Sequence, residues 1–125
     1  MMNFNGEKLS LISQGRGDLT FVFLHYFSGA AASWQWIIER LKADFRCVAL
    51  DLPGFGKTPP LAKPSLQSYS AHIKEVISQL RINRCVLIGH SMGGKMALQA
   101  AADGIDGLEQ VVLVTPSPPY PRTHV

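Results

Sequence analysis

Apolar residues are concentrated in four short runs along the chain, at 20–24, 47–50, 85–88 and 111–114. Within each run they are nearly continuous and do not alternate with polar residues. Continuous runs of this length are typical of strands that are covered on both faces, as in a parallel sheet. The pattern therefore predicts four buried strands in one mostly parallel, twisted sheet.

The stretches between these runs carry apolar residues at helical spacing. The first helical face consists of Trp34, Ile37, Ile38 and Leu41. A second, longer face lies in residues 66–80, with Ser65 placed to cap its helix, and a third helix is expected from about Met92 to about Gly104. Strands and helices that alternate at these lengths favour right-handed crossovers and an α/β fold with helices on both faces of the sheet.

The two ends of the chain depart from this alternation. An Asn-Gly dipeptide at 5–6 separates residues 2–4 from 8–12, which predicts an antiparallel hairpin with a two-residue turn. The prolines in 115–121 exclude a helix there and predict an extended segment. No repeat or linker divides the chain, so we expect a single domain over residues 1–125.

Composition and charge narrow the class of protein. Apolar residues make up 46% of the chain and charged residues 17%, which favours a packed globular domain. The net charge of +3 comes from lysines and arginines that are scattered singly, so we expect no nucleic-acid partner. No run reaches the ~18 apolar residues of a membrane span, and residues 1–8 do not have the pattern of a secretory leader. We therefore expect a cytoplasmic protein with no membrane partner.

The two cysteines, Cys47 and Cys85, each lie in a predicted strand. The ordinary role of such a residue is that of a small buried hydrophobe. If another strand separates these two in the sheet, they stand roughly 9–10 Å apart, which is too far for a disulfide. We expect both thiols to be free.

The most informative motif is the sequence GHSMG at 89–93, between the third apolar run and the third predicted helix. Gly89 and Gly93 let the backbone crowd together around Ser91, so that its hydroxyl stands exposed on a sharp strand-to-helix turn. A serine held in this way is a candidate nucleophile, and the alternative is a glycine-rich turn with a solvated serine. His90 and Met92 are expected to be packing neighbours, although the backbone N–H of Met92 points to where an oxyanion would form.

The chain does not have the residue spacing of a phosphate loop, a dinucleotide-binding fingerprint or a metal site. The Gly-Lys-Thr at 56–58 suggests a phosphate loop, but Asp51 stands where that loop needs a glycine and two prolines follow it. We expect a structural turn with Asp51 capping its amides. The sequence has no G-x-G-x-x-G fingerprint and no group with metal-ligand spacing, so we expect neither a cofactor nor a metal.

Three motifs make the chain similar to the α/β-hydrolase superfamily over residues 6–121. The first is the turn at 89–94, and the second is HYFSG at 25–29, which resembles the family's His-Gly loop. The third is DLPGFG at 51–56, which resembles the family's turn after the next strand. The resemblance implies a serine hydrolase that acts on a small ester or related acyl substrate.

By this resemblance Ser91 is the nucleophile, and the backbone N–H groups of Phe27 and Met92 form the oxyanion hole. Two donors aimed at the developing charge are worth roughly 3–4 kcal/mol each. His25 is expected to organise its loop by hydrogen bonding rather than to carry protons. Tyr26 stands where the family has glycine; it either holds a strained positive φ at a cost of roughly 1–3 kcal/mol or packs beneath the loop.

The other members of a triad are not evident in the sequence. In this fold the acid and then the histidine follow the serine, and the downstream acids Asp103, Asp106 and Glu109 are expected at the opposite end of the sheet. His124, on the proline-rich tail, is expected to be solvent-exposed and not the base. The resemblance therefore implies an N-terminal part of the fold, without its last strands, cap, acid and histidine, that is nearly inert when isolated.

Two alternatives remain open at this stage. In the first, the chain is a non-catalytic fragment or interaction module that keeps the fold and the serine without the triad. In the second, a separate chain supplies the missing strands and the histidine. The last strand, 111–114, is expected to present an unpaired apolar edge that favours aggregation or pairing with another polypeptide.

Overall fold

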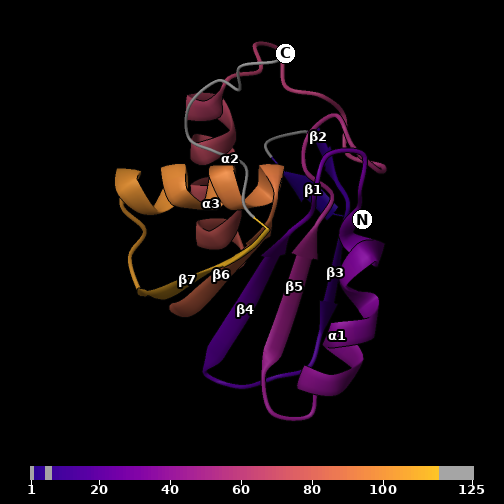
Figure 1. Cartoon of the computed structure of the whole chain (residues 1–125), viewed down its shortest axis with the longest axis vertical. Helices are drawn as coiled ribbons and strands as arrows, with labels where there is room; N and C mark the ends of the chain where they lie inside the picture. Colours follow the sequence, from indigo (N-terminus) through magenta and orange to yellow (C-terminus); the bar gives the residue numbers. More distant parts are fainter. Residues whose placement is uncertain (1, 5–6, 116–125) are drawn as a thin grey trace.

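The computed structural model describes residues 2–4 and 7–115, with side chains from residue 8 onwards. Its centre is a five-stranded sheet in the order β3-β5-β4-β6-β7 (Figure 1). The strands are β3 (Leu11–Gln14), β4 (Leu19–Leu24), β5 (Arg46–Leu50), β6 (Arg84–His90) and β7 (Leu108–Val114). Only β3 is antiparallel to its neighbour, and the other pairs are parallel. The mostly parallel sheet predicted from the apolar runs is confirmed.

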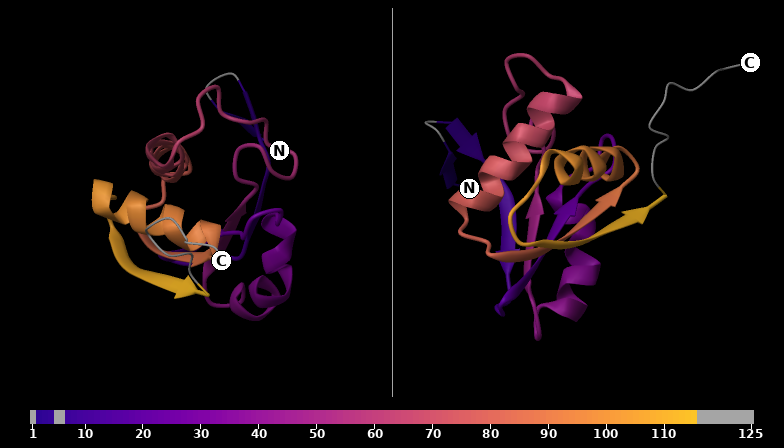
Figure 2. Two further views of the ribbon diagram at one scale, coloured as in Figure 1. Left: turned by 45° about the horizontal axis from the view of Figure 1, so that its top comes forward. Right: turned by 90° about the vertical axis from the view of Figure 1, so that its left-hand side faces the viewer.

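Helices cover both faces of this sheet, as predicted. They are α1 (Gln35–Leu41), which continues the 3₁₀ turn η1 (Ala31–Trp34), α2 (Leu66–Gln79) and α3 (Met92–Asp103). Figures 1 and 2 place α1 on one side of the sheet and α2 and α3 on the other. Each side has its own core, one built around Phe23, Trp34 and Ile38 and the other around α2 and α3. The side chain of Ser65 caps α2 by accepting the Ser68 N–H at 3.0 Å.

The N-terminal strands form a separate two-stranded sheet. β1 (Met2–Phe4) pairs antiparallel with β2 (Glu7–Leu9), which confirms the predicted pairing, while the turn at 5–6 lies outside the described residues. The segment predicted as one strand over 8–12 is broken at Ser10, whose N–H donates to Thr58 Oγ1 at 2.9 Å. This contact spans 48 residues of sequence, so the local pattern could not reveal it.

The cysteines lie as expected. Cys47 on β5 and Cys85 on β6 are both buried and unbridged, and β4 runs between their strands. Burial raises the pKa of Cys85 to about 11 and also raises the pKa of Cys47. Both thiols are therefore inert packing groups at neutral pH.

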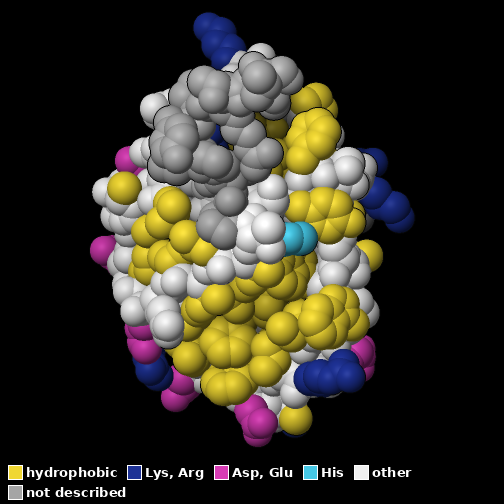
Figure 3. Space-filling model, in the orientation of Figure 1, with side chains coloured by type: hydrophobic (Ala, Val, Ile, Leu, Met, Phe, Trp, Pro, Cys, Tyr) yellow, Lys and Arg dark blue, Asp and Glu magenta, His cyan; other side chains and the backbone are white. Residues whose placement is uncertain are grey.

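β7 departs from the predicted burial. Its register with β6 puts Val112 beside Ile88 and Val114 beside His90, on the α1 side of the sheet. Val112 is 37% exposed and Val114 40%, because none of the described helices lies over β7 on that side. Figure 3 shows this face, where hydrophobic side chains gather in a broad patch over β4 and its neighbours. In the described part of the chain, the last strand is thus covered on one face only.

In the part of the chain that the structure describes, no helix is both long enough and apolar enough to cross a bilayer. The longest, α2, has 14 residues, whereas a spanning helix needs about 20.

Candidate active site

Ser91 occupies the turn between β6 and α3. β6 ends at His90, α3 begins at Met92, and Ser91 is the N-cap residue with φ 55° and ψ −112°. A non-glycine residue with such a φ is held there by its surroundings at a cost of order 1–3 kcal/mol. The side chain is half-buried at the carboxyl end of β6. This is the strand, sharp turn and helix that the sequence predicted around the serine.

The glycines on either side make this turn possible. A Cβ on Gly89 would fall on the backbone of Gly93 and Gly94, and a Cβ on Gly93 would fall on the carbonyls of Leu24 and His25. Strand β6, the start of α3 and the end of β4 therefore approach closely only because these positions lack side chains.

The loop at 25–29 lies at the carboxyl end of the sheet, as Ser91 does, because β4 pairs with β6 and Leu24 lies beside Gly89. The positive φ in this loop belongs to Ser28, at 64°, and not to Tyr26. The Tyr26 ring instead packs edge-to-face against His90, with ring centres 5.2 Å apart. Of the two alternatives for Tyr26, packing without backbone strain is the one the structure has.

His25 is fully buried and both of its ring nitrogens are engaged. Nδ1 lies 2.8 Å from the carbonyl oxygen of Tyr26, and Nε2 accepts the N–H of Leu52 at 3.0 Å. Burial lowers the pKa of His25, against the raising effects of the Tyr26 carbonyl and of the Asp51 charge. A neutral imidazole with both nitrogens occupied organises the loop, the role that the sequence suggested.

Asp51 ties together two further segments. Its Oδ1 accepts the N–H of Ala31 at 2.8 Å and its Oδ2 accepts the N–H of Lys57 at 3.1 Å. Burial alone would raise the pKa of Asp51, but these hydrogen bonds lower it. A Cβ on Gly56 would collide with the carboxylate. The turn expected at 51–58 is present, and the contact with Ala31, which the sequence did not reveal, links it to η1.

Aromatic side chains gather beside this loop. Phe27 is 68% exposed and packs edge-to-face on Phe55 at 5.6 Å between ring centres, and Phe55 also packs on His25 at 5.3 Å. Tyr26 is 39% exposed. The sequence pattern places Phe55 in a turn, and no local signal pairs it with Phe27. Tyr26, Phe27 and Phe55 thus form an apolar aromatic rim at the carboxyl end of the sheet, where Ser91 lies.

The acids downstream of Ser91 lie at the far end of the sheet, as expected. Asp103, at the end of α3, accepts a hydrogen bond from Ser70 Oγ at 2.6 Å. Glu109, at the start of β7, forms an ion pair with Arg84 at the start of β6. His124 lies outside the described residues.

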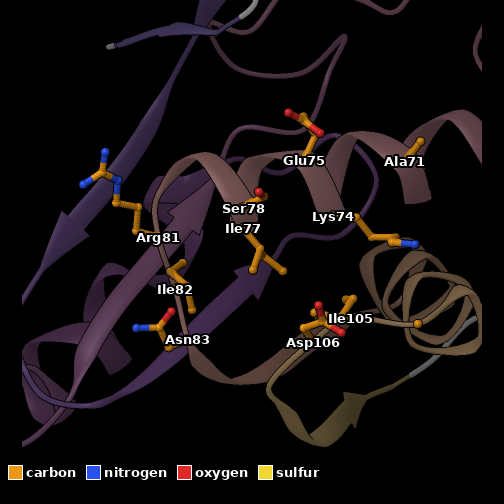
Figure 4. A pocket seen from close by; sticks show the side chains of 11 residues that line it. Ala71, Lys74, Glu75, Ile77, Ser78, Arg81, Ile82, Asn83, Ile105 and Asp106 are labelled. Atoms are coloured by element: carbon orange, nitrogen blue, oxygen red, sulfur yellow. The ribbon is translucent and has the colours of Figure 1, made fainter.

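Asp106 lines a hollow of about 600 Å³ at this far end (Figure 4). The hollow lies between the end of α2 and the turn before β7, and Lys74, Arg81 and Asn83 also line it. It is thus remote from Ser91. In residues 7–115, no group of three His, Cys, Asp or Glu side chains could hold a metal ion.

Comparison with known proteins gives a consistent result. The sequence profile of the alpha/beta hydrolase fold family matches residues 20–124. The chain is 33% identical over 113 residues to the dihydrolipoyllysine-residue acetyltransferase component of the acetoin cleaving system of Cupriavidus necator, covering 90% of this chain and 30% of that protein. It is 32% identical over 116 residues to the sn-1-specific diacylglycerol lipase ABHD11 of Danio rerio, covering 90% and 37%.

The fold matches as well. A solved structure described as a marine microorganism esterase superposes with a TM-score of 0.80 at 26% identity, covering 86% of this chain and 41% of that one. The chain therefore spans between 30% and 41% of the length of these proteins. On the strength of the sequence profile and of the shared sheet and helices, the chain belongs to the alpha/beta hydrolase fold family.

Proposed function

We propose that this chain is the nucleophile-bearing part of a serine hydrolase that cleaves a small ester or related acyl substrate, with Ser91 as the nucleophile. The observation that carries the proposal is the φ of 55° at Ser91, at the first turn of α3 and at the carboxyl end of β6. Strain of this kind clusters at active sites, where it holds a reacting group in place. The relatives named as a lipase and an esterase support the same class of reaction.

The proposed reaction begins when Ser91 Oγ attacks the carbonyl carbon of the ester and its proton passes to a base. The carbonyl oxygen becomes an oxyanion, for which the backbone N–H groups of Phe27 and Met92 are the proposed donors. The N-terminus of α3 adds a favourable dipole for the negative charge. The intermediate then collapses to an acyl-serine and releases the alcohol, which takes up the proton, and water later hydrolyses the acyl group.

The base and its orienting acid are proposed to lie outside residues 7–115. His25 is engaged through both ring nitrogens and His90 packs between aromatic rings, at 5.2 Å from Tyr26 and 6.4 Å from Trp34. The relatives are more than twice as long as this chain. A histidine and an acid supplied by the same polypeptide or by a second chain would complete the site.

The aromatic rim supports a substrate with an apolar acyl group. Phe27 exposes 68% of its surface and lies against Phe55, so an apolar group bound there would gain about 25 cal/mol for each Å² of surface removed from water. The relative from Danio rerio is named as a diacylglycerol lipase. We propose short acyl esters as the first substrates to test.

Chemical rescue tests this proposal on the chain as it exists. Hydrolysis of p-nitrophenyl butyrate is followed with and without millimolar imidazole as an external base. After subtraction of the hydrolysis by imidazole alone, we expect an imidazole-dependent rate contributed by the protein that disappears in Ser91→Ala. It should persist in Ser78→Ala, which removes an exposed serine on α2. Equal rates for the wild type and Ser91→Ala, with imidazole present, would exclude Ser91 as the nucleophile.

A second candidate function is a non-catalytic hydrolase-fold module that binds another polypeptide. The observation that favours it is the open α1 side of β7, with Val112 and Val114 over a third exposed at the edge of the sheet. The same rescue experiment separates the two, because a module of this kind shows no Ser91-dependent hydrolysis. If a second chain supplies the base, activity without imidazole should appear only on mixing.

A further inference from the structure

We infer that His25 is a positioning residue that fixes the orientation of the Tyr26–Phe27 peptide, and through it the direction of the Phe27 N–H. The inference rests on the proposed function, in which that N–H stabilises the oxyanion. It concerns a side chain that touches neither substrate nor Ser91 in the proposed reaction. The observation behind it is the pair of hydrogen bonds that the buried imidazole makes.

The hydrogen bonds determine which nitrogen carries the proton. A backbone N–H can only donate, so Nε2, which lies 3.0 Å from the Leu52 nitrogen, accepts and carries no hydrogen. The proton of the neutral ring is then on Nδ1, which donates to the Tyr26 carbonyl oxygen at 2.8 Å. His25 is therefore held as the Nδ1–H tautomer, between the loop at 25–29 and the turn after β5.

Peptide geometry transmits this constraint to Phe27. The carbonyl of Tyr26 and the N–H of Phe27 belong to one planar trans peptide, so they point in opposite directions. The Tyr26 oxygen accepts a second hydrogen bond, from the Gly29 N–H at 2.8 Å. Rotating this peptide would break both bonds and leave the buried Nδ1–H of His25 without an acceptor, at a cost of order 1–3 kcal/mol. The proposed oxyanion donor is thereby preorganised.

The surroundings of the ring keep it neutral. His25 faces Asp51, the one charged group among its described contacts, the ring of Phe55 and the backbone carbonyl of Tyr26. A proton on Nε2 would set two donors, the ring and the Leu52 N–H, against each other. Because burial also disfavours the cation, the tautomer that holds the peptide is maintained.

The first experiment does not require activity. ¹⁵N NMR of His25 at pH 7 should show the Nδ1–H tautomer. Hydrogen exchange should find the Leu52 amide more strongly protected than the amides of the neighbouring turn. An Nε2–H tautomer, an imidazolium or an unprotected Leu52 amide would overturn the inference. Because this readout is independent of Ser91 chemistry, the experiment tests the inference even if the chain has no hydrolase activity.

The second experiment uses two variants that separate the two nitrogens. An asparagine amide reaches about where Nδ1 stands, so His25→Asn keeps a donor for Tyr26, whereas a glutamine amide reaches about where Nε2 stands, so His25→Gln keeps the partner of Leu52. The readout is phosphonylation of Ser91 by a fluorophosphonate, resolved into the maximal rate and the probe concentration at half-maximal rate.

For His25→Gln we expect a fall of about 100-fold in the maximal rate, as for loss of one oxyanion donor, with little change in half-saturation. His25→Asn should recover at least a tenth of the wild-type rate. Equal rates in the folded wild type and His25→Gln, or equal losses in both variants, would overturn the inference. If neither variant folds, the NMR measurement on the wild type decides it, and a wild type that does not label contradicts the proposed function instead.

Discussion

At the scale of the residue, the site depends on backbone positions that tolerate only certain side chains. Ser91 holds a positive φ that glycine would adopt without strain, and Gly93 touches backbone that any side chain would strike. The sequence allowed these two features to be predicted, because glycines at this spacing around a serine, between an apolar run and a helical pattern, favour a sharp strand-to-helix turn. Capping of the 51–58 turn by Asp51 was also expected and is present. The His25–Leu52 and Asp51–Ala31 hydrogen bonds were out of reach, because each joins two segments that are distant in the sequence.

The strained backbone at Ser91 predicts that replacing the serine with glycine stabilises the fold. Ser91→Gly should be more stable than Ser91→Ala by about 1 kcal/mol, since alanine retains the strained φ and glycine does not. Urea unfolding of the two variants measures the difference. An alanine variant as stable as the glycine variant, or more so, would contradict the claim that the turn is strained.

The two glycines that begin α3 provide a matched pair. Gly93→Ala puts a Cβ onto the Leu24 and His25 carbonyls and should lower the unfolding free energy by about 1–3 kcal/mol. Gly94→Ala meets its nearest atom at 3.2 Å and gains helix propensity, so its effect should be within about 1 kcal/mol of zero. Equal effects in the two variants, measured by thermal unfolding, would argue against the close approach of α3 and β4.

The buried His25 and the half-buried His72 predict a pH dependence of stability. Burial lowers the pKa values of His25 and His72 below the ordinary 6.5. From pH 6.5 down to the folded pKa values, the unfolded chain binds protons that the folded chain does not, so stability falls as the pH is lowered.

Between pH 7.5 and 5.5, the free energy of unfolding should fall by at most about 1.4 kcal/mol per pH unit for each histidine. The carboxylates with lowered pKa values, such as Asp51, act only at lower pH. Urea midpoints at pH 7.5, 6.5 and 5.5 provide the test, with His72→Gln expected to reduce the slope. A midpoint that stays constant or rises on acidification would contradict the burial of these rings.

At the scale of the element, continuous apolar runs and helical faces were sufficient to place the four parallel strands and the helices around them. The sequence misplaced features that depend on distant partners. Ser10 breaks a predicted strand by bonding to Thr58, and the helix expected from Trp34 begins instead as the 3₁₀ turn η1, where Asp51 accepts the Ala31 N–H. Both features are set by a loop far along the chain rather than by local propensity.

The cap of α2 gives a prediction at this scale. Ser65 Oγ accepts the Ser68 N–H, so Ser65→Ala should lower the unfolding free energy by about 1 kcal/mol. Ser78→Ala, near the exposed end of the same helix, serves as the control and should change it little. Chemical denaturation of both variants supplies the comparison, and a Ser65→Ala variant no less stable than the control would show that the cap contributes nothing.

At the scale of the whole molecule, the open α1 side of β7 is the feature that we expect to govern the behaviour of the chain in solution. A parallel sheet is ordinarily covered on both faces, whereas among residues 7–115 β7 is both an edge strand and covered on one face only. We predict that the isolated chain self-associates, in a manner that depends on concentration. Val112→Lys should reduce this association in sedimentation velocity, whereas Leu98→Lys, at a comparably exposed site on α3, should not. If Val112→Lys and Leu98→Lys self-associate to the same extent, the contact between chains does not involve the open side of β7.

The central claim, that the fold activates Ser91, is tested most directly by the rate of its phosphonylation in the folded chain. The reference is a synthetic peptide of residues 85–97, which carries the same serine without the turn. Because an oxyanion hole and substrate binding alone leave roughly 10³–10⁴-fold catalysis over water when a triad member is removed, we predict labelling at Ser91 at least about 100-fold faster in the chain. Equal rates in chain and peptide, or labelling mapped to another serine, would contradict the account.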